Sequence, residues 1–313
     1  MKERSCVIVD AYSTGRYLPE EFERYEIGTV HVMSAAQIPA IFQPHFNADL
    51  YDEVIRPPEQ MSNEEIVEFH AQVLRGRKLE FVIAGCETGV ELADSLSERL
   101  GLPSNGTALS AARRDKARLS DALGAAGVRS IRQVVSNNAE EVTNWKHRAD
   151  FDEIVVKPLN STGTEDVFFC STDADIRRAV GAIVGKTNRT GAFNHFALGQ
   201  EKINGQQYTV NAVSIDGEAF VTEAWTYDTV PIEGASSVCS VERLLGGAGN
   251  RLFINCPTTW CALCRRFRLS TDLLMPRSSS TIGDRFWWTS ERGFKEPCRQ
   301  KHEQWRWVIT IWR

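Results

Sequence analysis

Apolar and polar residues alternate along the first hundred or so residues in a pattern that predicts strands and helices in turn. Four short apolar runs predict strands, which lie at 5–10, 29–32, within 48–55 and at 81–84. Two amphipathic stretches predict helices, which lie at 64–74 and 90–100. Strands that alternate with helices are typical of a parallel, doubly wound sheet, and such a sheet binds ligands at the carboxyl ends of its strands.

The pattern changes after a linker of Gly, Ser, Asn and Thr at 104–110. Three further helices are predicted, at 111–126, 138–145 and 174–184. Six further strands are predicted, at 129–135, 154–156, 167–169, 198–203, 208–215 and 219–225. The last two strands are expected to form a hairpin around Asp216-Gly217, because Asp-Gly is a preferred hairpin turn.

One stretch, EIVVKPLNSTGTEDVFFC at 153–170, carries the clearest candidate chemistry. A buried strand leads into Lys157, a small polar loop follows at 160–164, and a second apolar run follows the loop. Backbone N–H groups and hydroxyls in such a loop can wrap phosphate oxygens, and the lysine can neutralise their charge. The stretch is not a Walker A motif, because no Gly-Lys-Ser/Thr follows the loop and no helix opens there. An ordinary hairpin with a lysine that extends to solvent remains the alternative.

Two acidic residues, Glu87 and Glu91, follow the predicted strand at 81–84 and are about one helical turn apart. Because they lie at the carboxyl end of a strand, they are candidate substrate-binding residues. The alternative is that these acids stabilise the first turn of the following helix through its dipole.

Composition excludes some functional classes. With 42% hydrophobic and 25% charged residues among 313, the chain is an ordinary globular sequence, long enough for two or three small domains. A net charge of -5 gives no general reason to expect a nucleic-acid partner. The sequence shows no signal-peptide pattern and no apolar run long enough to span a bilayer. We therefore expect a cytoplasmic protein with no membrane partner, whose eight cysteines are thiols.

Charge and composition shift abruptly near Cys239. From there onward the chain has eleven Arg and two Lys against six Asp and Glu, a formal charge of +7, so the preceding part carries -12. Six of the eight Trp and five of the eight Cys also lie in this last part. A shift of this size marks a boundary.

Five segments, taken in order, resemble one known superfamily. They are AGCETGVELADSLSERLGLPSNG (84–106), SAARRDKARLSDALGAAGV (110–128), EIVVKPLNSTGTEDVFFC (153–170), QEKINGQQYTV (200–210) and VTEAWTYD (221–228). Together they resemble the ATP-grasp superfamily and, more narrowly, its carboxylate–amine ligases of the L-amino acid ligase (bacilysin synthetase) type. The resemblance covers the chain from its start to about residue 245.

This resemblance implies an α/β and α+β fold in which ATP is clamped between two lobes. It implies a Rossmann-like pre-ATP-grasp domain at 1–104, a first lobe at 105–196 and the start of a second lobe at 197–245. Residues 246–313 do not follow the family pattern, and we expect them to be an aberrant tail, disordered or poorly packed, that leaves the second lobe incomplete.

The resemblance also assigns roles to particular residues. Lys116 and Lys157 would hold ATP phosphates, and the 160–166 loop would close over the β- and γ-phosphates through its residues Ser161, Thr162, Gly163 and Thr164. Backbone groups of Glu201, Lys202 and Ile203 would form a hinge against adenine. The family has a glutamate, for a ribose or cation contact, where this chain has Gln207. Trp225, and with it His195 and Tyr227, are candidates for lining the substrate pocket.

The chemistry implied is phosphorylation of a carboxylate to an acyl phosphate, followed by attack of an amine. Phosphoryl transfer depends on positioning and charge stabilisation more than on protein nucleophiles, so a cation-lined loop suits it. The implied cofactors are ATP and Mg²⁺, and the implied partners are small carboxylates and amines, namely amino acids. A homodimer is compatible with the resemblance, and a nucleic-acid partner is not expected.

The sequence from Leu252 to Arg313 lacks the acidic pattern that holds magnesium in the family, so no metal ligands are identified. Cys261 and Cys264 form a C-x-x-C pair with Cys256 nearby, but a zinc site needs a second ligand pair, and Cys298 with His302 is a loose match.

We hypothesise that this tail is the family's C-terminal lobe translated in a shifted reading frame. With the frame moved by one base, Phe286-Trp287-Trp288-Thr289 must encode Leu-Val-Asp, and Met275-Pro276 must encode Ala, at points where the family has these residues. The change would lie between about Cys239 and Arg251. It would leave weak ATP binding, little ligase turnover and poor solubility. The alternative is a non-catalytic nucleotide-binding or regulatory module whose basic, Trp-rich tail binds a partner.

Overall fold

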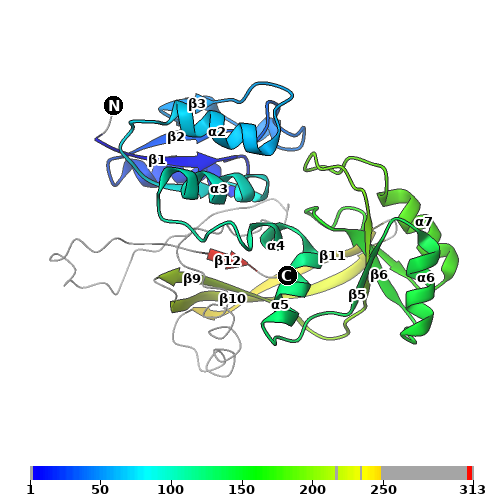
Figure 1. Ribbon diagram of the computed structural model, residues 1–313. Coiled ribbons are helices and arrows are strands. Elements are labelled where there is room, and N and C mark those ends of the chain that lie inside the picture. The colour runs from blue at the N-terminus through cyan, green and yellow to red at the C-terminus, as the bar shows by residue number, and fades with distance from the viewer. Residues whose placement is uncertain (1–2, 216–217, 233–234, 248–308, 312–313) are drawn as a thin grey trace.

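The fold contains three β-sheets with helices packed against two of them (Figure 1). The computed structural model describes residues 3–215, 218–232, 235–247 and 309–311. One sheet is parallel and lies at the N-terminus, and the two that follow along the chain are antiparallel. The α/β and α+β fold class predicted from the sequence is therefore confirmed.

The parallel sheet has the strand order β3-β2-β1-β4. Its strands are β1 (Arg4–Val9), β2 (Ile27–Val32), β3 (Glu53–Ile55) and β4 (Leu79–Ala84). All four predicted strands are present. The connection from β1 to β2 contains two elements that the sequence pattern did not predict, the 3₁₀ turn η1 (Thr14–Tyr17) and the short helix α1 (Leu18–Glu23). Two further 3₁₀ turns, η2 (Gln43–His45) and η3 (Ala48–Leu50), precede β3.

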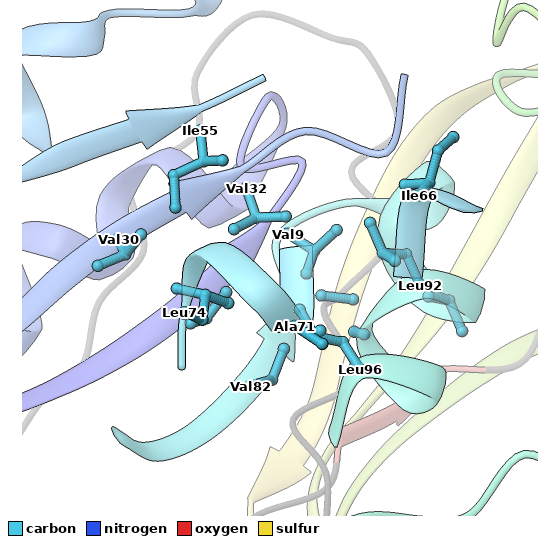
Figure 2. Close-up of a cluster of buried hydrophobic side chains, with 14 residues drawn as sticks. Val9, Val30, Val32, Ile55, Ile66, Ala71, Leu74, Val82, Leu92 and Leu96 are labelled. Atoms are coloured by element: carbon cyan, nitrogen blue, oxygen red, sulfur yellow. The ribbon is translucent and has the colours of Figure 1, made fainter. Parts of the chain in front are cut away.

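Both faces of this sheet are covered, because alternate residues of each strand enter different cores. Helices α2 (Asn63–Val73) and α3 (Val90–Leu100) pack on the face that carries Val7 and Val9 (Figure 2). Cys6 and Ile8 point to the opposite face, where α1 contributes the apolar residues. The helices begin and end as the sequence pattern indicates. Ser62 and Glu65 form a capping box at the start of α2, and Gly101 closes α3 in the left-handed conformation.

The single helix predicted at 111–126 is in fact two helices, α4 (Ser110–Arg114) and α5 (Lys116–Ala125). The break lies at Asp115, whose backbone is extended and whose carboxylate accepts hydrogen bonds from the N–H groups of Ala117 and Arg118 at 2.8 and 3.0 Å. An acid in this position caps the start of a new helix. In Figure 1, α4 follows α3 and connects the parallel sheet to the rest of the chain.

The first antiparallel sheet has the order β5-β8-β6-β7. Its strands are β5 (Gln133–Ser136), β6 (Ile154–Pro158), β7 (Phe168–Cys170) and β8 (Ala197–Glu201). Helices α6 (Ala139–Arg148) and α7 (Asp173–Ile183) cover one face and bury a core around Ile154, Val156 and Ile176. Several boundaries were predicted wrongly: β5 starts at Gln133 rather than 129, α6 ends at Arg148 rather than 145, β6 ends at Pro158 rather than 156, and β8 ends at Glu201 rather than 203.

The second antiparallel sheet has the order β11-β10-β9-β12. Its strands are β9 (Gln207–Ile215), β10 (Glu218–Ile232), β11 (Ala235–Gly247) and β12 (Ile309–Ile311). The predicted pairing of the first two strands is confirmed by their antiparallel register, although β10 is longer than predicted and β11 was not predicted. The Asp216-Gly217 turn lies outside the described residues.

Most of the tail also lies outside the described residues. This includes Cys256, Cys261, Cys264, Cys298, His302 and the segments that carry the reading-frame hypothesis. No helix within the described ranges is long and apolar enough to cross a bilayer.

Candidate functional site

The start of α5 lies against the loop that follows β6. The backbone N–H of Lys116 donates to the carbonyl of Leu159 at 3.2 Å. The Lys116 ammonium donates to two carbonyls of the same loop, those of Leu159 at 3.1 Å and Ser161 at 3.3 Å. The Asp115 cap directs the first turn of α5, and with it Lys116, onto this loop.

Lys157 lies in the strand that leads into this loop. It is the fourth residue of β6 and is paired with Leu198 of β8, and the 160–166 loop begins three residues later. Both Lys116 and Lys157 are half-buried. The structure therefore brings the two predicted lysines to one loop, although they are 41 positions apart in the sequence.

The loop itself, 160–166, has an unusual backbone. Gly163, Thr164 and Asp166 all have positive φ angles, of 65°, 58° and 50°. A left-handed residue next to a right-handed one can turn successive N–H groups toward one side, which is how backbone nests bind anions. Ser161 is buried and its hydroxyl donates to the carboxylate of Glu165. The Thr164 hydroxyl donates to the Gly163 carbonyl at 2.7 Å.

The predicted adenine hinge lies where β8 ends. Glu201 forms an ion pair with Arg132 at 2.7 Å. Although burial opposes ionisation, hydrogen bonds from Arg132 outweigh it and lower the pKa of the Glu201 carboxyl. Lys202 pairs with Glu153, and the Ile203 side chain is 58% exposed. The Glu201 and Lys202 side chains thus brace the end of β8, which is compatible with a hinge that acts through its backbone.

Two other predicted residues lie on the second antiparallel sheet. Gln207 begins β9, and its carbonyl accepts a hydrogen bond from the Thr226 hydroxyl at 3.1 Å. Trp225 lies on β10, half-buried, between Thr209 and Leu244 of the neighbouring strands. His195 is exposed beside Phe193.

Glu87 and Glu91 differ in their surroundings. Glu87 lies in the 3₁₀ turn η4 (Glu87–Gly89) after β4 and forms an ion pair with Arg114 at 2.5 Å. Glu91 is exposed in the first turn of α3, the position in which an acid stabilises a helix. Glu87 therefore anchors the segment that carries Lys116.

Comparison with known proteins identifies the superfamily. No family model matches the chain. The chain is 34% identical over 221 residues to dapdiamide A synthase of Enterobacter agglomerans, an alignment that covers 70% of this chain and 51% of that protein. It is also similar in structure to an L-amino acid ligase from Bacillus licheniformis, with a TM-score of 0.57 and 15% identity over 85% of this chain and 61% of that one. The chain belongs to the ATP-grasp superfamily. It spans about half the length of its curated relative.

Two other solved ATP-grasp structures support the fold. The D-alanyl-alanine synthetase A from Vibrio cholerae has a TM-score of 0.57 at 12% identity and covers 86% of this chain and 83% of that one. The purK N5-carboxyaminoimidazole ribonucleotide synthetase, described as an ADP complex, has a TM-score of 0.60 at 12% identity and covers 87% and 65%. At such low identities these likenesses concern the fold alone.

Sequence reasoning missed a pair of arginines that join the parallel sheet of this ATP-grasp chain to the segment that carries Lys116. Arg113 pairs with the buried Asp94 at 2.6 Å and also donates to the Gly106 carbonyl at 2.9 Å. Its neighbour Arg114 holds Glu87. The consecutive arginines just before Lys116 were the available signal, but their partners lie too far away in the sequence to be identified from spacing.

A second missed cluster lies at the carboxyl ends of β1 and β4. Asp10 is buried and accepts hydrogen bonds from the Ser34 N–H at 2.8 Å, the Ser34 hydroxyl at 2.5 Å and the Thr88 hydroxyl at 2.6 Å. Burial raises the pKa of Asp10, and it also raises the pKa of the Cys86 thiol to about 12. These hydrogen bonds join the loops after β1, β2 and β4. The cluster therefore stabilises the edge of the sheet where its strands have their carboxyl ends.

Proposed function

We propose that this chain is an ATP-dependent ligase that joins the carboxylate of one amino acid to the amine of another. The observation that supports this proposal best is the position of Lys116 and Lys157 at one polar loop of positive-φ residues. The relationship to dapdiamide A synthase supports the same reaction class.

In this proposal the two ammonium groups neutralise the phosphates of ATP. Ser161, Thr162, Thr164 and the loop N–H groups at Gly163 bind the terminal phosphate oxygens and exclude water. A substrate carboxylate oxygen attacks the γ-phosphorus and releases ADP, giving an acyl phosphate. The amine then attacks the acyl carbon and releases phosphate. Fixed cations and donors accelerate such transfers by stabilising charge on the transferred group.

The remaining predicted residues have supporting roles. Backbone groups at Glu201, Lys202 and Ile203 contact adenine, and Gln207 contacts ribose. We assign Trp225 to the substrate side of the second sheet. Glu87 acts through Arg114, and we assign Glu91 only to the stability of α3.

Magnesium, when bound, would offset the negative charge of the ATP phosphates. Among the residues that the structure describes, no group of three or more His, Cys, Asp or Glu side chains could hold a metal ion. The sequence after Leu252 also lacks the family's acidic pattern. From this sequence pattern we propose that the nucleotide lysines are retained while ligase turnover is low, as the shifted-frame hypothesis requires.

Magnesium-dependent ADP release in the presence of mixed amino acids tests the function. ATP binding with slow, amino-acid-dependent ADP release supports an impaired ligase, whereas ATP binding with no amino-acid dependence favours a non-catalytic nucleotide-binding module. Turnover comparable to dapdiamide A synthase would contradict the impairment. The encoding DNA across codons 235–255 tests its cause, and the hypothesis is wrong if no alternative frame encodes a family-like lobe.

A further inference from the structure

The Glu165 carboxylate lies at a point where several donors converge. It accepts the hydroxyl of Ser161, and both of its oxygens lie 3.0 Å from the backbone nitrogen of Arg189. The Arg189 guanidinium is 3.7 Å away through Nε. The Glu165 carboxylate thus interacts with one hydroxyl, one backbone N–H and one guanidinium. Only 17% of its side-chain surface is exposed.

The turn that presents Arg189 is held by other contacts. The side-chain oxygen of the buried Asn188 accepts hydrogen bonds from the Thr190 N–H at 3.0 Å, the Thr190 hydroxyl at 2.7 Å and the Ala192 N–H at 3.1 Å. Its amide nitrogen donates to the Asn160 carbonyl at 2.9 Å, at the start of the loop. Because Asn188 fixes both the turn and its contact with the loop, the position of the Arg189 N–H does not depend on Glu165.

A further donor lies beside this turn. Asn194 is only 4% exposed, and its side-chain oxygen accepts from Asn188 at 3.2 Å. Its side-chain nitrogen has no hydrogen-bond partner within the described ranges. A buried amide donor without an acceptor costs free energy, which an incoming oxygen can recover. One buried donor, the Asn194 amide nitrogen, therefore lies unpaired beside the turn among the residues that the structure describes.

We propose that Ser161 and the backbone N–H and guanidinium of Arg189 form a subsite for the terminal phosphoryl group of ATP. Glu165 occupies this subsite until the nucleotide displaces it. This inference rests on the proposed function, and it adds Arg189 and Glu165 to the nucleotide site. Carboxylate and phosphoryl oxygens use the same donors, so the two anions compete for them.

Titration calorimetry of the full-length chain with ATP, inorganic tripolyphosphate and adenosine tests the subsite. The variant Glu165→Gln removes the competing charge and keeps the size of the side chain. We expect the dissociation constants for ATP and tripolyphosphate to fall about fivefold to thirtyfold, because one or two charge-assisted contacts no longer need to be broken. Adenosine affinity should not change. Glu165→Ala should act in the same direction, and a thermal melt of each variant shows whether it is folded.

Asp173→Asn is the matched control, because it changes the net charge of the chain by the same amount. Asp173 lies at the start of α7, where its carboxylate contacts the exposed His147. It should leave phosphate affinity within twofold of wild type. Adding Arg189→Ala to the Glu165→Gln variant should weaken tripolyphosphate binding about tenfold, the size of effect expected for one charged hydrogen-bonding partner.

Each outcome is decisive. Unchanged or weaker phosphate binding by folded Glu165→Gln and Glu165→Ala chains overturns the subsite, and ATP binding by all forms would then leave the nucleotide function intact. If wild type and both variants bind neither ATP nor tripolyphosphate, the subsite and the nucleotide function are both wrong. Binding that is detectable only in the Glu165 variants supports displacement.

Discussion

The parallel sheet and the second antiparallel sheet both carry apolar residues along their strands but bury them differently. In the parallel sheet, Val7 and Val9 on one face and Cys6 and Ile8 on the other are fully buried. In the sheet of β9–β11, Tyr208 and Leu244 are each 55% exposed. An apolar strand becomes core only when another layer covers it, and alternation along one strand does not show whether that layer is present.

The largest expected difference in stability between the two sheets comes from removing one ion pair in each region. Arg113→Ala leaves the buried Asp94 without its partner, and we expect a loss of about 3–5 kcal/mol in the free energy of unfolding. Arg243→Ala breaks the exposed pair with Asp228 on the second sheet and should cost about 0–1 kcal/mol. Urea denaturation of both variants measures the contrast, and equal losses would show that the two regions do not differ in this way.

Two leucines provide a matched test of packing. Leu96 of α3 is fully buried in the core between α2, α3 and the parallel sheet (Figure 2), whereas Leu244 lies on β11 with more than half its surface exposed. Leu96→Ala should cost about 2–5 kcal/mol of stability, because it removes buried methyl groups and leaves a cavity. Leu244→Ala should stay within about 0.5 kcal/mol of wild type, as expected for an exposed position. The urea midpoints of the two variants would coincide if β11 were as well packed as α3.

The parallel sheet should also make stability sensitive to acid. Burial lowers the pKa of His31 to about 3 and that of His70 to about 4. Both imidazoles are therefore neutral in the folded chain at pH values where the unfolded chain protonates them. The free energy of unfolding that the two neutral imidazoles contribute is fully present above pH 6.5. It is lost as the pH falls toward 4 for His70 and toward 3 for His31. From pH 7.5 to pH 5 we expect a loss of about 2 kcal/mol for each histidine.

Urea denaturation at the two pH values measures this loss. The variant His70→Gln should reduce the loss by about half, because one of the two depressed groups is removed. A loss that is the same in the variant and in wild type would assign the acid sensitivity to other groups.

The sequence predicted what local periodicity determines. Helix α3 was predicted at its observed bounds, because its apolar spacing and its Gly101 stop are both local signals. The break at Asp115 was missed, because the apolar spacing continues across it and the Asp115 cap lies inside the periodic stretch; the pairs of Arg113 and Arg114 with acids 19 and 27 positions earlier were also missed. The β11 strand was missed because its polar and apolar residues do not alternate clearly.

For the site, motif resemblance pointed to Lys116, Lys157 and the loop. In the structure Lys116 contacts the loop and Lys157 lies in the strand that leads into it, and their roles stay proposals. The resemblance could not identify Arg189 as the residue that contacts Glu165 of the loop. Glu165 is one acid in a polar stretch, and Arg189 lies 24 positions later in a turn without a motif. Only the folded backbone, held by Asn188, brings that N–H to the carboxylate.

The most direct test of the account is the affinity of the full-length chain for ATP after removal of either lysine. Calorimetry should show that Lys116→Ala and Lys157→Ala each weaken ATP binding about tenfold to a hundredfold, since each loses a charged partner of the phosphates. Lys78→Ala, which removes an exposed lysine paired with Glu3, should bind as wild type does. ATP affinity that is unchanged in both site variants would contradict the account.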